Sequence, residues 1–433
     1  MSTLISNRTL PVHLNLNVRG LKPSATLAIN ELSNRLRAQG KTVYKLGLGQ
    51  SPFPVPTPVV EALKANAFQK DYLPVKGLRA LREAVAEYRR RRHGTECTGD
   101  DVLIGPGSKE LMFLLQLVYY GDLVIPTPSW VSYAPQAHII GRHVRWLETH
   151  AENQWRLVPE ELERLCGEDH GRPRIVILNY PSNPTGLTYG SSELEAIAET
   201  ARKHGIVLLS DEIYGELHHQ GQHVSIASFY PEGTIISGGL SKWCGAGGWR
   251  LGTFIFPPGL RWLLDSMANV ASETYTSTSA PIQYAAVRAF QGGSEIEQYL
   301  ASSRRVLAAL GQHIAKKMQE AHIAVASPQG GFYLFPDFSN GAARLRERGI
   351  TTSTEFCEKL LTETGVAILP GSEFGRPRNE LTARLAYVDF DGSRALAAAD
   401  QLPATALPDE TFLNTYCGAN LEATSRLCDW FQS

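Results

Sequence analysis

The sequence predicts an α/β fold with a mostly parallel sheet, and three short apolar runs support that prediction. Residues 174–178, 206–209 and 234–236 are each dominated by Ile, Val and Leu, as expected for buried strands. A segment with helical periodicity separates the first two runs. Strands that alternate with helices in this way are typical of parallel sheets.

The crossover helix between the first two runs is expected over residues 192–204. Ser192 and Glu195 have the spacing of a capping box. Apolar side chains follow at positions 194, 197, 198 and 201, which is helical spacing. His204 and Gly205 then supply a stop signal.

Each apolar run leads into polar side chains. Asn183 follows the first run, Asp211 and Tyr214 follow the second, and Lys242 and Arg250 follow the third. Ligands of open α/β sheets bind beyond the carboxyl ends of the strands. We therefore expect these five side chains to meet in one crevice.

The five side chains suit pyridoxal 5′-phosphate (PLP), a cofactor that acts as an electron sink. An unprotonated lysine amine, here Lys242, bonds to the cofactor's aldehyde. Asp211 can keep the pyridine nitrogen protonated, and Tyr214 and Asn183 can contact the 3-oxygen. Arg250 offers a fork of donors to the phosphate.

The same residues resemble the motifs of class I aminotransferases, the aspartate aminotransferase-like enzymes of PLP fold type I. The resemblance runs from about Gly20 to about Gly392. It rests on Ser241-Lys242 with Gly248 and Arg250, on Asn183-Pro-Thr-Gly186, and on Ser210-Asp211-Glu-Ile-Tyr214. It implies a three-layer sandwich with a mostly parallel sheet, plus a smaller α+β domain.

The resemblance also implies a domain division. Residues 45–300 would form the large PLP-binding domain, and residues 1–44, with an N-terminal arm, would join residues 301–433 in the small domain. Residues 299–321 read as the linking helix, and residues 330–335 as a small-domain strand. Residues 393–419 are longer than the usual connection and are expected to be a surface insertion before a final helix at 420–431.

Individual roles follow from the resemblance. The catalytic residues would be Lys242, Asp211 and Tyr214. Further cofactor contacts would come from Asn183, Ser108, Lys109, Trp130, Ser241, Arg250 and Tyr72, and substrate contacts from Gly49, Asn183, Arg384, Trp130 and Lys109. Tyr72 would reach the phosphate of a neighbouring subunit, which implies a homodimer with shared active sites. Gly239 departs from the pattern, because many relatives have a phosphate-contacting serine there, and we expect weaker cofactor retention at most.

The implied reaction is transamination between an L-amino acid and a 2-oxo acid. Lys109 resembles a lysine that meets the distal carboxylate of the substrate in an aspartate-specific subgroup, which favours aspartate or glutamate with oxaloacetate or 2-oxoglutarate. An aromatic or broad-specificity aminotransferase would use the same core residues. A PLP-dependent C–S or cyclising lyase shares them too. The physiological donor, acceptor and pathway stay open.

Composition restricts the remaining classes. The chain has 433 residues, 43% hydrophobic and 20% charged, with a formal net charge of −1, which predicts a globular protein of two or more domains without affinity for nucleic acid. No apolar run approaches the roughly 20 residues that a membrane span requires. Six scattered cysteines favour a reducing compartment, and hence the cytoplasm. The acid-poor start before Glu31 leaves a short organellar presequence open.

Two basic clusters have simple explanations. The four arginines at 89–92 close a helical stretch, where cations complement the helix dipole, so we expect a solvated helix end. His218, His219 and His223 lie in a Gly/Gln-rich stretch without a metal-ligand pattern, so we expect a solvated turn and no metal.

Overall fold

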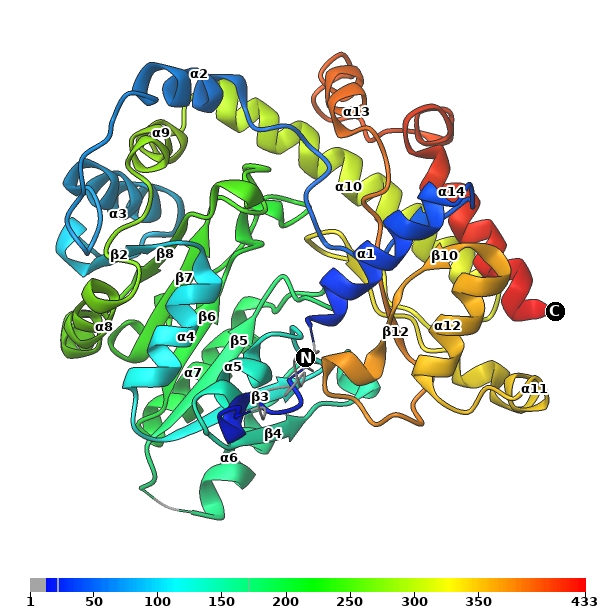
Figure 1. Cartoon of the computed structure of the whole chain (residues 1–433), viewed down its shortest axis with the longest axis horizontal. Helices are drawn as coiled ribbons and strands as arrows, with labels where there is room; N and C mark the ends of the chain where they lie inside the picture. Colours follow the sequence, from blue (N-terminus) through cyan, green and yellow to red (C-terminus); the bar gives the residue numbers. More distant parts are fainter. Residues whose placement is uncertain (1–12, 22, 170) are drawn as a thin grey trace, which may run out of the picture.

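The computed structural model describes residues 13–21, 23–169 and 171–433 (Figure 1). Its centre is a seven-stranded sheet in the order β2-β8-β7-β6-β5-β3-β4. The strands are β2 (Val102–Gly105), β3 (Asp122–Thr127), β4 (Val144–Glu148), β5 (Arg174–Asn179), β6 (Val207–Asp211), β7 (Thr234–Gly239) and β8 (Gly252–Ile255). Only β8 runs antiparallel to its neighbours, so the predicted mostly parallel sheet is confirmed.

Helices cover both faces of this sheet, because successive side chains of a strand point to opposite sides. Leu123 and Ile125 of β3 pack with α4 (Ser108–Val118), α5 (Tyr133–Ile139) and α8 (Arg261–Glu273). Val124, between them, packs with α6 (Pro159–Gly167) and α7 (Ser191–Lys203). The three-layer sandwich is therefore confirmed.

The crossover helix α7 begins one residue before its predicted start, and its predicted cap is wrong. The carboxylate of Glu193, not Glu195, accepts a 2.6 Å hydrogen bond from the Gly190 backbone N–H. Gly190 is the N-cap residue, so Glu193 is the third residue of the helix. From that position a carboxylate can accept a hydrogen bond from the backbone N–H of the N-cap residue. Its apolar face is buried as predicted.

The rest of the chain builds a second, smaller set of sheets. A three-stranded antiparallel sheet has the order β11-β12-β9, and β1 pairs with β10 in parallel. These strands are β1 (Tyr44–Lys45), β9 (Tyr333–Leu334), β10 (Val366–Ala367), β11 (Leu369–Pro370) and β12 (Ala383–Ala386). The further helices are α1 (Ala25–Ala38), α2 (Thr57–Asn66), α3 (Arg79–His93), α9 (Ala280–Gln291), α10 (Ser294–Glu320), α11 (Ala342–Glu347), α12 (Ser353–Thr364), α13 (Gly392–Ala399) and α14 (Glu410–Gln432).

The long helix α10 runs from the side of the large sheet, near α2, to the side of the small sheets, near α14 (Figure 1). It begins at Ser294, five residues before the expected start. The domain boundaries at 45 and 300 stay a prediction. Residues 1–12, where the expected arm or presequence begins, lie outside the described residues. Within the part of the chain that the structure describes, no helix is long and apolar enough to cross a membrane.

The segment 393–419 is an ordered cover over α10. Helix α14 begins at Glu410, ten residues before the expected start, with a non-helical turn at Cys417. Arg305 of α10 donates to the carbonyls of Pro403 (2.7 Å) and Ala399 (2.8 Å). These hydrogen bonds attach the segment to α10 at the surface of the molecule.

Candidate functional site

A cavity of about 550 Å³ opens where the predicted site residues meet. Its lining includes all but one of them: Gly49, Ser108, Lys109, Trp130, Asn183, Asp211, Tyr214, Ser241, Lys242, Arg250 and Arg384. The exception is Tyr72, whose side chain is 90% exposed outside the cavity. Residues from widely separated parts of the chain therefore converge beyond the strand ends, as the topology requires.

Asp211 ends β6 and is buried. Its carboxylate accepts hydrogen bonds from Tyr133 Oη (2.6 Å) and Ser237 Oγ (3.2 Å). Burial raises the pKa of Asp211 to about 6, although both hydrogen bonds act in the opposite direction. A buried carboxylate facing a cavity is a suitable partner for a cationic ring nitrogen, because a buried charge requires a counter-charge.

Lys242 follows β7, and its Nζ donates to the Gly49 carbonyl at 2.8 Å. Burial, followed by the nearby Arg384 charge, lowers the pKa of Lys242 to about 8. A substantial fraction of the amine is therefore neutral at pH 7 to 8. That is the form that attacks a carbonyl carbon.

The anion-binding end of the cavity lies at the start of α4. Ser108 is the first residue of this helix, and backbone N–H groups at a helix N-terminus attract anions. Arg250 lies against Gly107, where a Cβ atom would come within 2.1 Å of the guanidinium and would force it to move. Gly107 also has a φ of +93°, which favours glycine.

Arg384 of β12 is 1% exposed and lies between two aromatic rings. Its guanidinium carbon is 4.8 Å from the centre of the Tyr333 ring and 4.9 Å from that of Phe374. It donates to Asn183 Oδ1 at 3.0 Å and to the Gly47 carbonyl. A fixed planar guanidinium of this kind recognises carboxylates through paired hydrogen bonds.

Lys109 is a second cation on the cavity wall. Its Nζ lies 5.1 Å from the centre of the Trp130 ring, within cation–π range. Burial and the charge of Arg250 lower the pKa of Lys109. The cavity therefore carries Lys109 and Arg384 as separate cations, in addition to the reactive lysine.

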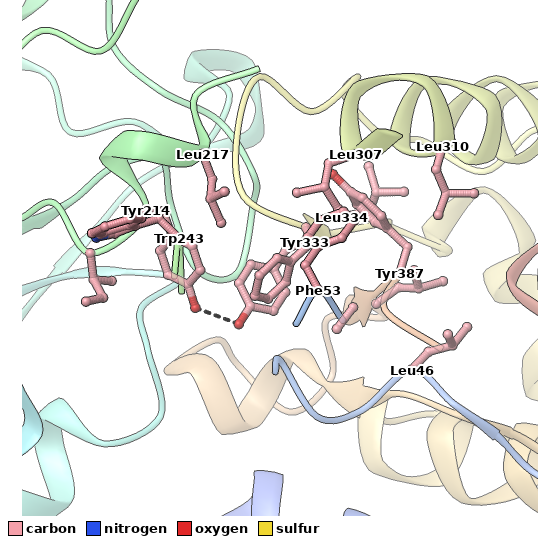
Figure 2. Packing of buried hydrophobic residues seen from close by; sticks show 14 of the residues in the cluster. Leu46, Phe53, Tyr214, Leu217, Trp243, Leu307, Leu310, Tyr333, Leu334 and Tyr387 are labelled. Atoms are coloured by element: carbon pink, nitrogen blue, oxygen red, sulfur yellow. Dashed lines mark hydrogen bonds between the residues drawn. The ribbon is translucent and has the colours of Figure 1, made fainter. Parts of the chain in front are cut away.

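Sequence reasoning missed Tyr133 and Tyr333, which also line the cavity. Tyr133 bonds to Asp211, and Tyr333 Oη lies 2.7 Å from Tyr214 Oη, as Figure 2 shows. Tyr133 stands at the end of the motif that contains Trp130, but nothing local predicts its partner. Tyr333 lies in the stretch 330–335, which the sequence predicts only as a small-domain strand.

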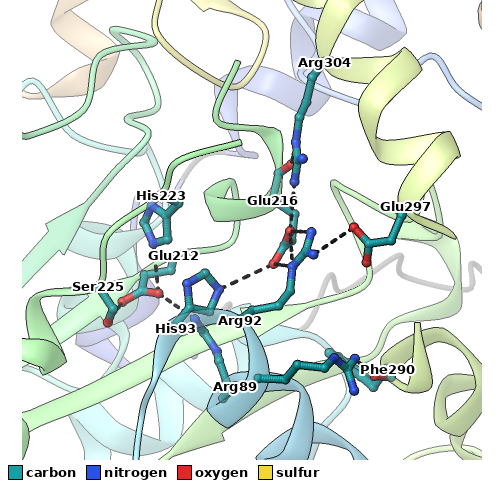
Figure 3. Close-up of polar contacts among 11 residues, drawn as sticks. Arg89, Arg92, His93, Glu212, Glu216, His223, Ser225, Phe290, Glu297 and Arg304 are labelled. Carbon is teal, nitrogen blue, oxygen red and sulfur yellow. Dashed lines mark hydrogen bonds and ion pairs between the residues drawn. The ribbon is translucent and has the colours of Figure 1, made fainter. Parts of the chain in front are cut away.

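The expectation of a solvated helix end at 89–92 is wrong for Arg89 and Arg92. Arg89 reaches inward and pairs with the buried Glu212 at 2.7 Å, as Figure 3 shows. Arg92 pairs with Glu216 and Glu297, each at 2.8 Å. The end of α3 faces the loop after β6, where Glu212 and Glu216 are buried. The two arginines turn inward because they pair with these carboxylates. The intervening Arg90 and Arg91 are exposed, as predicted.

The expectation of a solvated histidine turn is also wrong for His219 and His223. The His223 side chain is 3% exposed and bonds to Glu212 at 3.0 Å. His219 bonds to the carbonyls of Pro328 (3.2 Å) and Gly331 (3.1 Å). His223 is thus a hydrogen-bonded part of the interior, because buried polar groups need partners. The half-buried His219 attaches this turn to residues 328 and 331.

Comparison with known proteins identifies the family. A model of the class I and II aminotransferases matches residues 41–389. The chain belongs to this family. It is 37% identical to an aspartate aminotransferase from Geobacillus stearothermophilus over 380 residues, which cover 86% of this chain and 93% of the relative.

Solved structures agree with this membership. The aspartate aminotransferase from Thermus thermophilus, solved with maleate, matches with a TM-score of 0.80 and 30% identity, over 90% of this chain and 98% of that one. An aromatic aminotransferase from Pyrococcus horikoshii matches with a TM-score of 0.74 and 30% identity, over 92% and 98%.

This aminotransferase uses PLP, as its family does. The residues of the cavity fit that cofactor. The buried Asp211 carboxylate would pair with the protonated ring nitrogen, and the partly neutral Lys242 would bond to the aldehyde. Arg250, which lies against Gly107, would donate hydrogen bonds to the phosphate.

Proposed function

We propose that this aminotransferase prefers dicarboxylic substrates, with aspartate or glutamate as donor and 2-oxoglutarate or oxaloacetate as acceptor. The observation that carries the proposal is that Lys109 and Arg384 both line the cavity that contains Lys242. One cation can take the α-carboxylate and the other the distal carboxylate. Maleate, the ligand named for the Thermus thermophilus structure, is itself a dicarboxylate.

In this proposal Arg384 grips the α-carboxylate, with Asn183 and the backbone of Gly49 beside it. The amine of Lys242, once free, would take the proton from the substrate Cα as general base and deliver it to the cofactor's C4′ as general acid. The bound cofactor supplies the electron sink for this step. Because Lys242 lies 2.8 Å from the Gly49 carbonyl, the proton carrier is held next to the carboxylate site.

The other residues hold and tune the cofactor. Asp211 keeps the ring nitrogen protonated, and Tyr214 donates to the 3-oxygen. Ser108, Ser241 and Arg250 hold the phosphate, and Trp130 stacks on the ring. These assignments are supported by the shared cavity and by the family's use of PLP.

We also propose a homodimer in the cytoplasm. Tyr72 and Phe68 are large side chains that are 90% and 73% exposed, which favours a contact surface for a second copy. Tyr72 would then complete the phosphate site of that copy. All six cysteines are free and buried, which suits a reducing compartment.

The decisive experiment records the absorbance of the PLP-loaded protein while L-aspartate and then 2-oxoglutarate are added. We expect the band of the cofactor bound to Lys242 to convert to that of its amino form and then to return. No change with aspartate, but conversion by phenylalanine or tyrosine, would replace the dicarboxylate proposal with an aromatic one, a function named for the Pyrococcus horikoshii relative. Release of pyruvate or ammonia without an acceptor would indicate a lyase.

A further inference from the structure

Tyr333 lies at a junction of the site, although it has no role in the reaction as proposed above. Its Oη is 2.7 Å from Tyr214 Oη, and both side chains are almost completely buried, at 1% and 2% exposure. Figure 2 shows the two rings approaching from opposite sides, Tyr214 from the loop after β6 and Tyr333 from β9. The hydrogen bond therefore joins the large sheet to the small one.

Two further contacts fix the position of the Tyr333 hydroxyl. Its ring lies against the guanidinium of Arg384, 4.8 Å from the ring centre. A Cβ atom on Gly49 would lie 1.8 Å from Tyr333 Oη, so the hydroxyl occupies the space that a side chain there would need. Gly49 in turn accepts the hydrogen bond of Lys242. The hydroxyl cannot move without disturbing its neighbours.

The direction of the Tyr333–Tyr214 bond follows from proton count. Each phenol has one proton to donate and can also accept. If the Tyr214 O–H donates its hydrogen bond to the 3-oxygen of the cofactor, the Tyr214 oxygen can only accept a hydrogen bond from Tyr333. The Tyr333 O–H must then be the donor between the two phenols.

We propose that Tyr333 is a positioning residue that donates to Tyr214 and so directs the Tyr214 proton to the 3-oxygen of the cofactor. The inference rests on the proposed role of Tyr214. A phenol that accepts a hydrogen bond becomes a stronger donor, because chains of hydrogen bonds polarise one another. Tyr333 therefore stabilises a negative 3-oxygen through Tyr214. With the 3-oxygen stabilised in this way, the nitrogen that joins Lys242 to the cofactor binds its proton less tightly.

The test is a pH titration of the absorbance of the PLP-loaded full-length protein. We compare wild type, Tyr333→Phe, Tyr214→Phe and the double variant. Tyr333→Phe is expected to raise the titration midpoint by about half a pH unit, a roughly threefold gain in proton affinity, and Tyr214→Phe to raise it further. In the Tyr214→Phe background, Tyr333→Phe is expected to change nothing.

Tyr387→Phe is the matched control. Tyr387 is equally buried, and its hydroxyl donates to the Gly331 carbonyl at 3.4 Å, not to Tyr214. The titration midpoint of Tyr387→Phe is expected to equal that of the wild type. A midpoint unchanged by Tyr333→Phe, or a shift of the same size without the Tyr214 hydroxyl, overturns the inference alone. If the wild type shows no titrating PLP band, or if Tyr214→Phe has the same midpoint as the wild type, the proposed role of Tyr214 is overturned and the inference with it.

Discussion

Tyr133 Oη donates a 2.6 Å hydrogen bond to Oδ2 of Asp211, and this contact connects α5 to the end of β6. Both side chains are buried, at 1% and 3% exposure. The hydrogen bond favours the charged carboxylate, but burial outweighs it and holds the pKa of Asp211 at about 6. The protein without cofactor therefore contains a carboxylate that is costly to ionise, and a cationic ring nitrogen would relieve that cost.

Asp211→Asn is expected to stabilise the cofactor-free protein in a pH-dependent way. The folded pKa of about 6 exceeds the usual 3.8, so the stabilisation from the protonated carboxyl is complete below pH 3.8 and is lost as pH rises through 6. The variant should gain about 3 kcal/mol in unfolding free energy over the wild type at pH 7, and about half of that at pH 5. Urea unfolding at the two pH values measures this, and an equal gain at both contradicts it.

Lys242→Ala is expected to abolish turnover and covalent capture of PLP while leaving the fold intact. In the wild type, the rate of capture should rise about tenfold between pH 7 and pH 9, because the lowered pKa of about 8 makes the amine neutral within that range. A lysine with an ordinary pKa would show a rise of roughly a hundredfold. Borohydride reduction followed by mass spectrometry measures the attached cofactor, with Lys76→Ala, a half-exposed lysine on the surface, as control.

Lys109→Ala tests substrate preference. If Lys109 binds the distal carboxylate, kcat/KM for L-aspartate should fall by about 10- to 100-fold, as for a lost charged hydrogen bond, while the value for L-phenylalanine changes little. Steady-state kinetics with both donors measures the difference. Lys64→Ala, on the exposed face of α2, serves as the control. An equal loss for both donors would place Lys109 with the cofactor and not with the substrate.

The Arg89–Glu212 pair should contribute strongly to folding. Arg89 and His223 hold the pKa of Glu212 well below its usual range despite burial, so the carboxylate is charged. Arg89→Met leaves that charge without its principal partner and is expected to cost about 3 kcal/mol of unfolding free energy. The exposed Arg90→Met should cost under about 0.5 kcal/mol. Denaturant unfolding compares them, and Arg89→Met/Glu212→Gln should recover part of the loss.

The sequence predicted the chemistry of the site better than its surroundings. Asn183, Asp211 and Lys242 could be placed together because each follows an apolar run, and the ends of parallel strands share one edge of a sheet. Gly239 shows the limit of this reasoning. It was expected only to lack a hydroxyl, but its φ is +150° and a Cβ atom would lie 2.6 Å from the Leu251 carbonyl. Glycine is required there by the close approach of β8.

Helix boundaries were less predictable for a local reason. Two acidic residues near the start of α7 offer plausible caps, and only the path of the chain at Gly190 selects Glu193. Similarly, α14 extends back to Glu410 because Asp409 accepts from the Phe412 N–H at 2.8 Å, a cap that periodicity alone did not single out.

By itself, the sequence determined the α/β class, the mostly parallel sheet and the set of reactive groups, because hydrophobic periodicity and residue type are local properties that strand order converts into proximity. Only the tertiary structure decided what supports those groups. Tyr133 lies 78 residues from Asp211, Tyr333 lies 119 residues from Tyr214, and Arg89 lies 123 residues from Glu212. Contacts over such distances depend on how sheets and helices pack, and no local pattern in the chain encodes them.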